Sequence, residues 1–163
     1  MSEKYIWLPD LALLANCSCR KDFLDSVYSF FREDFIENTV MCKTCPVKIQ
    51  TGRMDSGWED TFWHLIAEGN GVRIIKDYRC ERIRWPKSII DNLSHKDVIF
   101  WRKAHLSGGK KEIRLKILLS DFSYAVILGE QKNYFIIRAA YPIDRRHTYK
   151  KLKGEYEKCK NNP

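Results

Sequence analysis

Residues 98–142 read VIFWRKAHLSGGKKEIRLKILLSDFSYAVILGEQKNYFIIRAAYP and contain four short segments rich in β-branched and aromatic residues. The connections at 107–109, 120–121 and 129–133 are typical of tight chain reversals. Consecutive strands joined by short reversals pair antiparallel. This stretch therefore predicts a roughly four-stranded antiparallel sheet, with strands at 98–101, 113–119, 124–128 and 134–140.

Helical patterns flank the predicted sheet on both sides. An apolar face at helical spacing predicts an amphipathic helix over 20–38, and it consists of Phe23, Val27, Phe30, Phe31 and Phe35. Pro86 suits the first turn of a helix that runs to about residue 93, and the charged segment 144–160 predicts a C-terminal helix. Residues 39–50 look extended, although Pro46 argues against a central strand there. The expected class is α+β, with N-terminal helices before the sheet and one helix after it.

The size and composition of the chain suit one globular domain. It has 163 residues, of which 44% are hydrophobic and 13% aromatic, enough for a buried core. No apolar run approaches the roughly 20 residues of a membrane span. The N-terminus lacks the basic flank and apolar segment of a signal peptide. We therefore expect a cytoplasmic protein without a membrane partner.

The positive charge is concentrated beyond the first 50 residues. Residues 1–50 hold 6 Lys and Arg against 7 Asp and Glu, whereas residues 51–163 hold 23 against 14. A charge excess confined to one part of a chain favours a polyanionic partner, nucleic acid first. The same excess also fits a solvated surface that keeps a protein soluble.

Four of the six cysteines form two close pairs, in the patterns C-x-C and C-x-x-C. Two chelating pairs that meet in space build a tetrahedral thiolate site. The sequence therefore predicts one structural zinc ion, bound by Cys17, Cys19, Cys42 and Cys45. The predicted helix between the pairs would be about 28 Å long, so the chain would have to fold back. Free thiols and a disulfide, which is uncommon in the cytosol, are the alternatives.

A set of histidine, basic and tyrosine residues is suited to chemistry on a phosphodiester. His64 lies within the apolar segment 61–67, and an Arg-rich segment at 78–86 follows it. Arg114 and Lys116 share one strand face, because side chains alternate along a strand. The candidate residues are His64, Arg79, Arg82, Arg84, Arg114, Lys116, Arg138, Tyr141 and His147.

These residue types suit metal-independent cleavage of RNA. The reaction needs a base for the ribose 2′-hydroxyl, an acid for the 5′-oxygen and cations for the phosphorane charge. Histidine titrates near neutral pH and suits both proton transfers. Arginine offers phosphate a planar donor fork, and tyrosine donates a proton or stacks on a base. No carboxylate cluster for Mg²⁺ is evident in the sequence, so we expect no catalytic metal.

Each candidate also has an ordinary structural interpretation. A single histidine in an apolar segment is more often a core residue with satisfied hydrogen bonds. The three arginines of 79–84 fit a solvated helix face, and Arg114 with Lys116 fits the wet side of a strand. Tyr141 fits an anchor at the sheet edge.

Several segments, taken in order over about 58–158, resemble the phage-associated nucleases of the Barnase–EndoU–Colicin E5/D–RelE (BECR) superfamily. Residues 59–66 resemble the histidine-bearing motif, and 79–85 resemble the Arg-rich segment that ends in a tryptophan. The strands and C-terminal helix of the family are similar to 98–101, 124–128, 134–142 and 151–157. The resemblance implies metal-independent endoribonuclease chemistry on a sheet that carries N-terminal helices.

The leading hypothesis is a toxin-like endoribonuclease that cleaves tRNA or ribosome-associated RNA. Residues 1–57 would form a helical region with the cysteine pairs, and 58–163 a BECR-like ribonuclease domain, together one compact unit. RNA would be the main partner, with a cognate antitoxin or immunity protein as a second. The alternative is a non-catalytic RNA- or protein-binding module, for example a phage-encoded inhibitor of a host system.

The residues divide into catalytic and substrate-binding groups under this hypothesis. His64 is predicted as general acid or base, Arg82 and Arg114 as phosphate stabilisers, and Tyr141 as an acid or a stacking surface. Substrate binding is predicted for Arg79, Arg84, Lys116, Arg138 and His147. His147 is in addition a candidate for the second proton transfer.

Overall fold

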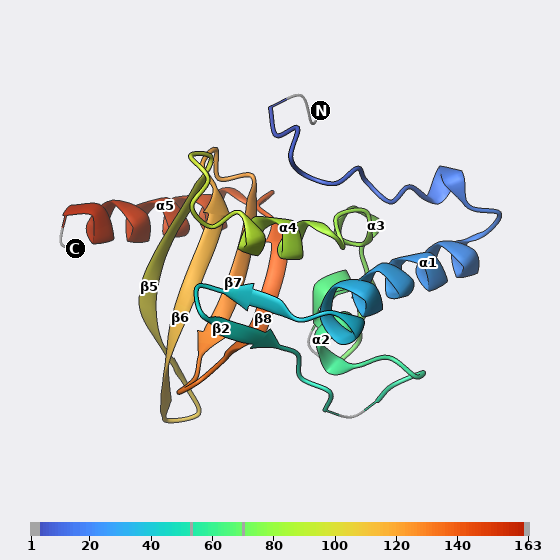
Figure 1. Ribbon diagram of the computed structural model, residues 1–163, viewed down its shortest axis with the longest axis horizontal. Helices are drawn as coiled ribbons and strands as arrows, with labels where there is room; N and C mark the ends of the chain where they lie inside the picture. The colour runs from blue at the N-terminus through green and yellow to red at the C-terminus, as the bar shows by residue number, and fades with distance from the viewer. Residues whose placement is uncertain (1–3, 53, 70, 162–163) are drawn as a thin grey trace.

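A mixed six-stranded sheet forms the centre of the computed structural model, which describes residues 4–52, 54–69 and 71–161 (Figure 1). The strand order is β1-β2-β8-β7-β6-β5. The first two strands form a hairpin, and β2 runs parallel to β8. The other four form an antiparallel meander. The strands are β1 (Val40–Cys42), β2 (Cys45–Lys48), β5 (Val98–Ser107), β6 (Lys110–Leu119), β7 (Tyr124–Glu130) and β8 (Phe135–Pro142).

The predicted α+β class is confirmed, but the four-stranded antiparallel sheet is wrong in size and in type. The meander β5–β8 occupies the predicted segments, and residues 39–50 add two strands, one of them parallel to its neighbour. Pro46 is tolerated inside this sheet because β2 pairs with β8 only through Val47 and Lys48. No bond to β8 therefore requires the N–H that proline lacks.

The long N-terminal helix, the helix after Pro86 and the C-terminal helix come from the segments that the sequence indicated, with shifted ends, whereas the short helices at Asp60–Ile66 and Asp77–Cys80 were not predicted. A 3₁₀ turn at Leu14–Asn16 precedes the long first helix, which continues into a π-helical turn at Glu33–Glu37. A small hairpin, β3 (Ala67–Glu68) with β4 (Ile74–Ile75), follows the second helix. The helices are α1 (Arg20–Arg32), α2 (Asp60–Ile66), α3 (Asp77–Cys80), α4 (Trp85–Asp91) and α5 (Arg146–Asn161).

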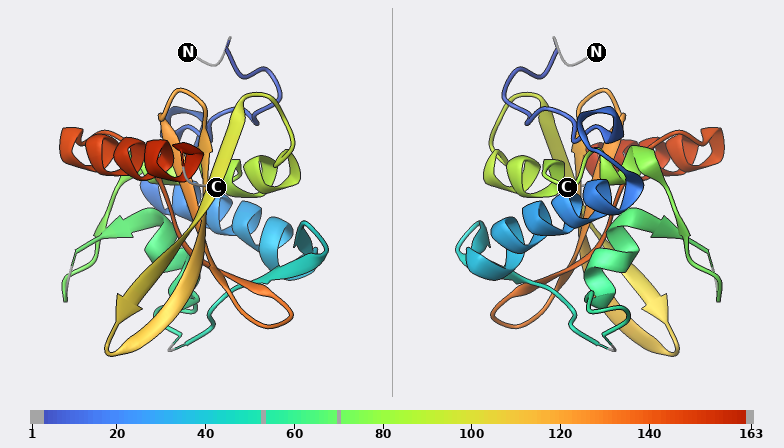
Figure 2. Two further views of the ribbon diagram at one scale, coloured as in Figure 1. Left: turned by 90° about the vertical axis from the view of Figure 1, so that its left-hand side faces the viewer. Right: turned by 90° about the vertical axis from the view of Figure 1, so that its right-hand side faces the viewer.

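The two faces of the sheet are covered differently (Figure 2). One face packs against α1 and α4, and α2 lies beside β8 and adds its buried side chains to the same core. This core takes in residues from Tyr5 to Ala140, so it crosses the predicted division at 57/58. The other face meets α5, which packs through Leu152 against a small cluster around Trp101 and Ile127. In the described part of the chain, no helix is long and apolar enough to cross a membrane.

Candidate functional site

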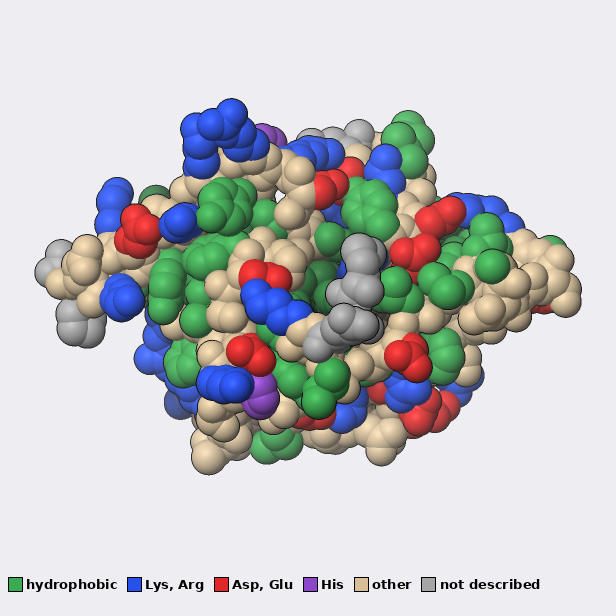
Figure 3. Space-filling model, turned by 90° about the horizontal axis from the view of Figure 1, so that it is seen from above, with side chains coloured by type: hydrophobic (Ala, Val, Ile, Leu, Met, Phe, Trp, Pro, Cys, Tyr) green, Lys and Arg blue, Asp and Glu red, His purple; other side chains and the backbone are tan. Residues whose placement is uncertain are grey.

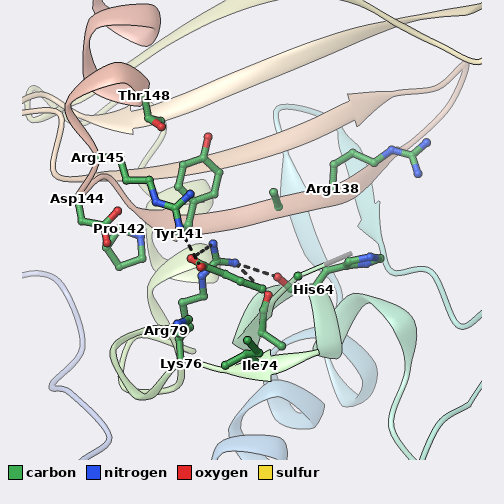
Figure 4. A pocket seen from close by; sticks show the side chains of 14 residues that line it. His64, Ile74, Lys76, Arg79, Arg138, Tyr141, Pro142, Asp144, Arg145 and Thr148 are labelled. Carbon is green, nitrogen blue, oxygen red and sulfur yellow. Dashed lines mark hydrogen bonds and ion pairs between the residues drawn. The ribbon is translucent and has the colours of Figure 1, made fainter. Parts of the chain in front are cut away.

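A groove runs over the α5 side of the sheet and consists of two adjoining cavities of about 600 and 450 Å³. The first cavity lies among β3, α3, β8 and the start of α5 (Figure 4). The second lies among β5, β6, β8 and the middle of α5. Four residues line both cavities, which makes the groove continuous: His64, Arg138, Ala139 and Tyr141.

His64 reaches the groove because α2 is amphipathic. Phe62, Leu65 and Ile66 point into the core, so His64 lies on the opposite side of the helix and is exposed. The backbone carbonyl of His64 accepts a hydrogen bond of 3.3 Å from Nη1 of Arg79. Its side chain extends in the same direction as that of Arg138 (Figure 4). The interpretation of His64 as a core residue is therefore wrong.

A β-bulge in β8 brings Arg138 and Tyr141 onto the groove side together. Leu128 of β7 pairs with Ile137 and Ile127 pairs with Ala139, so Arg138 is the extra residue. Strict alternation from the buried Ile137 would turn Tyr141 inward. The extra residue shifts the alternation by one, so Ala140 is buried and Tyr141 lines the groove. Bulges often re-aim a side chain beside a functional site.

Four groove-lining cations of β5, β6 and β8 are held by two carboxylates. Glu112 accepts hydrogen bonds from Arg138 and, at 3.2 Å, from Nε of Arg114. The buried Glu155 of α5 accepts from Nζ of Lys116 at 2.7 Å and from Nζ of Lys103 at 2.9 Å. These contacts fix the cations in place beside the second cavity, and those of Glu155 attach α5 to the sheet.

The ionisation of these groups follows from their neighbours. Burial disfavours the charged form of Glu155, but the ion pairs with Lys116 and Lys103 outweigh it and hold its pKa below the usual value. For Glu112, burial is likewise outweighed by the bonds from Arg138 and Arg114, so its pKa is also lowered. Burial raises the pKa of Tyr141, so its hydroxyl keeps its proton at neutral pH.

Positive charge predominates around the second cavity. Five Lys or Arg side chains line it, against the single carboxylate of Glu155 among the described residues. The exposed side of α5 adds further basic residues: Arg146, Lys150, Lys151, Lys153, Lys158 and Lys160. Blue side chains lie along the left of the molecule in Figure 3, where that helix is seen from above. A concave surface of one sign attracts ligands of the opposite sign. The groove therefore suits an anionic ligand.

Six of the nine predicted site residues line the groove. The first cavity includes Arg79, whose guanidinium lies 5.8 Å from the centre of the Tyr141 ring and pairs with Glu68. The second includes Arg114 and Lys116. Together with the shared residues, the predicted residues that line the groove are His64, Arg79, Arg114, Lys116, Arg138 and Tyr141.

The other three predicted residues lie outside the groove. Two of them are arginines after α3 that point in different directions, and the third is a histidine of α5. Arg82 donates to the carbonyl of Tyr78 at 2.8 Å and lies over the Trp85 ring. Arg84 pairs at 3.2 Å with the buried Asp34. His147 is exposed near the start of α5. Of the described residues that line the groove, none is one of these three.

The sequence reasoning missed a second histidine in the groove. His105 lines the second cavity, two residues beyond Lys103 on the same face of β5. The positive charge of Arg114 lowers the pKa of His105 below its usual value, so the ring is mainly neutral at neutral pH. The spacing of two that identified Arg114 and Lys116 would also have found this pair.

The structure gives the zinc prediction no support. Within 4–52, 54–69 and 71–161, no group of three or more His, Cys, Asp or Glu side chains is placed to hold a metal ion. The two pairs lie at opposite ends of α1 and its π-helical turn. Cys42 is buried, and burial raises its pKa to about 11, which disfavours the thiolate that zinc requires. The zinc site therefore stays a prediction from the sequence.

Comparison of the chain with protein-family models, curated proteins and solved structures found no match. The likeness to BECR nucleases therefore stays a resemblance between sequence segments. The class of this protein has to be inferred from the groove itself, which is a basic surface with two histidines and a protonated tyrosine.

Proposed function

We propose that this chain is a metal-independent endoribonuclease that holds RNA in the groove. The observation that carries the proposal is the meeting of His64, Arg114, Lys116, Arg138 and Tyr141 around two adjoining cavities. These side chains come from one helix and two strands that are far apart in the sequence. A surface that only keeps a protein soluble does not require this convergence.

The groove offers a group for each part of the reaction. A base removes the proton of the ribose 2′-hydroxyl, that oxygen attacks phosphorus, and the 5′-oxygen leaves with a proton from an acid. His64 and His105 suit the two proton transfers, and His105 takes the role that we had predicted for His147. Arg114, Lys116 and Arg138 would stabilise the phosphorane charge. The products are a 2′,3′-cyclic phosphate and a 5′-hydroxyl.

The same proposal includes the setting that the resemblance implies. The substrate class is tRNA or ribosome-associated RNA, the role is toxin-like, and an antitoxin or immunity protein is a partner. The basic groove supports a polyanionic substrate of this kind.

The second candidate is an RNA-binding module without catalysis. One observation favours it: Glu112 and Glu155 already pair with Arg114, Arg138, Lys103 and Lys116. Paired cations attract the backbone of RNA less strongly than unpaired ones and are less available to a transition state.

The test is cleavage of total tRNA and of RNA on translating ribosomes in the presence of EDTA. We expect cleavage that leaves 2′,3′-cyclic phosphate ends and fails when the ribose at the cut site is 2′-deoxy. His64→Ala should lower the rate by about 10²- to 10⁴-fold, with RNA affinity changed far less. His147→Ala is the matched control, because this histidine lies outside the groove, and it should keep the full rate.

Two outcomes would contradict the enzyme proposal. The first is a His64→Ala protein that melts like wild type and cuts at the full rate. The second is tight, saturable binding of RNA in the groove with no cleavage of any of these substrates, which would favour the binding module.

A further inference from the structure

The outer edge of β5 has no neighbouring strand, and the one backbone group there with a side-chain partner among the described residues is the carbonyl of Arg102, which accepts a hydrogen bond of 3.9 Å from Sγ of Cys159. β5 is the last strand of the sheet, and in the described part of the chain it pairs only with β6. This strand has ten residues, Val98–Ser107, which makes it one of the longest in the fold. It lies on the outside in Figure 1. An unpaired edge presents a row of backbone N–H and C=O groups that can pair with an added strand. β5 therefore offers a binding edge.

A cavity of about 450 Å³ opens beside this edge. Phe100 and Trp101 of β5, Leu115 of β6 and Tyr156 of α5 form its apolar part. Phe100 is 42% exposed, and the Trp101 and Tyr156 ring centres lie 5.5 Å apart. We call this cavity the edge pocket. It has room for an apolar side chain, and among the described residues it shares none with the groove.

The rim of the edge pocket is basic. Lys43, from the turn of the β1–β2 hairpin, lies with Nζ 5.5 Å from the centre of the Phe100 ring. Lys160 comes from the last turn of α5, and Arg102 from β5. Arg102 pairs with Glu130 at 2.9 Å, whereas neither lysine has an acidic partner within the described ranges. No carboxylate of the described residues lines this pocket.

We propose that the edge pocket and the β5 edge bind an extended acidic segment of a protein partner. The segment would add to β5 as a strand and place one apolar side chain in the pocket. Its carboxylates would meet Lys43 and Lys160. Added strands obtain affinity from backbone hydrogen bonds and specificity from pockets for alternate side chains, and both features are present here.

The charge of β5 argues against a second copy of this chain as the occupant. β5 carries Arg102 and Lys103 and has no acidic residue. Like charges opposite one another destabilise a strand pair, so two copies of β5 would repel. The regular backbone spacing of a strand edge also matches a peptide and not the backbone of a nucleic acid. Charge and edge geometry together favour an acidic peptide.

The first experiment measures fluorescence anisotropy with a labelled, blocked nonapeptide that has one central Ile flanked by alternating Thr and Glu. A peptide with Lys in place of Glu and a nine-nucleotide single-stranded RNA are the comparison probes. The intact chain should bind the acidic peptide, more weakly as salt rises, and should bind the basic one far less. In hydrogen exchange, the acidic peptide should protect amides of β5.

Reversing a charge at the rim of the edge pocket tests whether the acidic peptide binds there. Lys160→Glu should weaken binding of the acidic peptide on the order of five- to tenfold. Lys158→Glu is the matched control, because Lys158 is an exposed lysine of the same helix that does not line the edge pocket within the described residues. The double variant Lys43→Glu with Lys160→Glu should bind the basic peptide better than wild type does.

Three outcomes would overturn the proposal. One is an equal loss of affinity in Lys158→Glu and Lys160→Glu, which would mean attraction by overall charge alone. Another is binding of the RNA probe, and not of the acidic peptide, in a way that Lys160→Glu abolishes. The third is no binding of the acidic peptide at millimolar concentration. None of these outcomes bears on cleavage in the groove, which is tested separately.

Discussion

The two faces of the central sheet are built from alternate residues of the same strands, yet they have opposite characters. In β6, Leu115, Ile117 and Leu119 are buried under the helices, while Arg114 and Lys116 line the groove. The helix-covered face holds one large apolar core, whereas the α5 face is apolar only around Trp101 and Leu152. We propose that the two faces divide their roles, with stability on the first face and ligand binding on the second.

The largest expected effect comes from creating a cavity in the face that α1 and α4 cover. Phe31 is fully buried and contacts the rings of Phe35 and Phe62. Phe31→Ala should lower the free energy of unfolding by about 3–5 kcal/mol, because it removes apolar contacts and leaves a cavity. Denaturant titration measures this change. A loss smaller than that caused by Arg114→Ala would contradict the division between the faces.

The next effect concerns the attachment of α5 to the groove face. Glu155→Gln removes the charge that holds Lys116 and Lys103, and it should cost about 1.5–3 kcal/mol at pH 7, the range for hydrogen bonds to charged groups. The folded pKa of Glu155 is lowered, so its contribution is present above the unfolded pKa of about 4.3 and is lost as pH falls through the folded pKa. Unfolding measured from pH 7 to pH 3 should therefore show the two proteins converging in acid.

The control for this pH dependence is Glu157→Gln, which changes an exposed carboxylate of the same helix. It should follow the wild-type curve at every pH. If Glu155→Gln stayed less stable by the same amount at pH 3, the loss would come from packing and not from the ion pairs.

A smaller effect is expected for RNA binding at the groove face. Arg114→Ala should weaken RNA binding and reduce the slope of log affinity against log salt concentration by about 1, because one phosphate contact is lost. Arg82→Ala is the comparison, since Arg82 lies over Trp85 away from the groove. Filter binding over a range of salt concentrations measures both slopes. An equal change in both variants would mean that the groove is not where RNA binds.

The smallest effect on stability is predicted for His64. Its side chain is exposed, so His64→Ala should change the free energy of unfolding by less than about 0.5 kcal/mol. Thermal melting measures this change alongside the cleavage assay. A drop comparable to that of Glu155→Gln would restore the interpretation of His64 as a structural residue.

Most elements of the fold could be predicted, because their signals are local. The spacing of Phe23, Val27 and Phe31 identified α1, and Pro86 marked the first turn of α4. The size of the sheet could not be predicted, because β2 meets β8 across almost 90 residues of sequence and contributes only two paired positions. Local patterns do not report a contact of that kind.

The properties of the candidate site can likewise be separated into those that the sequence determines and those that it does not. The sequence determined which residue types are present and which of them share a strand, as with Arg114 and Lys116, because alternation is a local rule. It also determined the concentration of positive charge beyond residue 50. These properties depend on the chain alone.

Only the tertiary structure decided which of these residues meet. Packing of α2 beside β8 exposed His64 at the groove, and the bulge at Arg138 turned Tyr141 to the same side. Arg82 suited phosphate equally well by residue type, but the turn after α3 directs it onto Trp85. The physical reason is that a site depends on the directions of side chains from distant segments. Those directions are set by core packing and strand register, which a pattern along the chain does not contain.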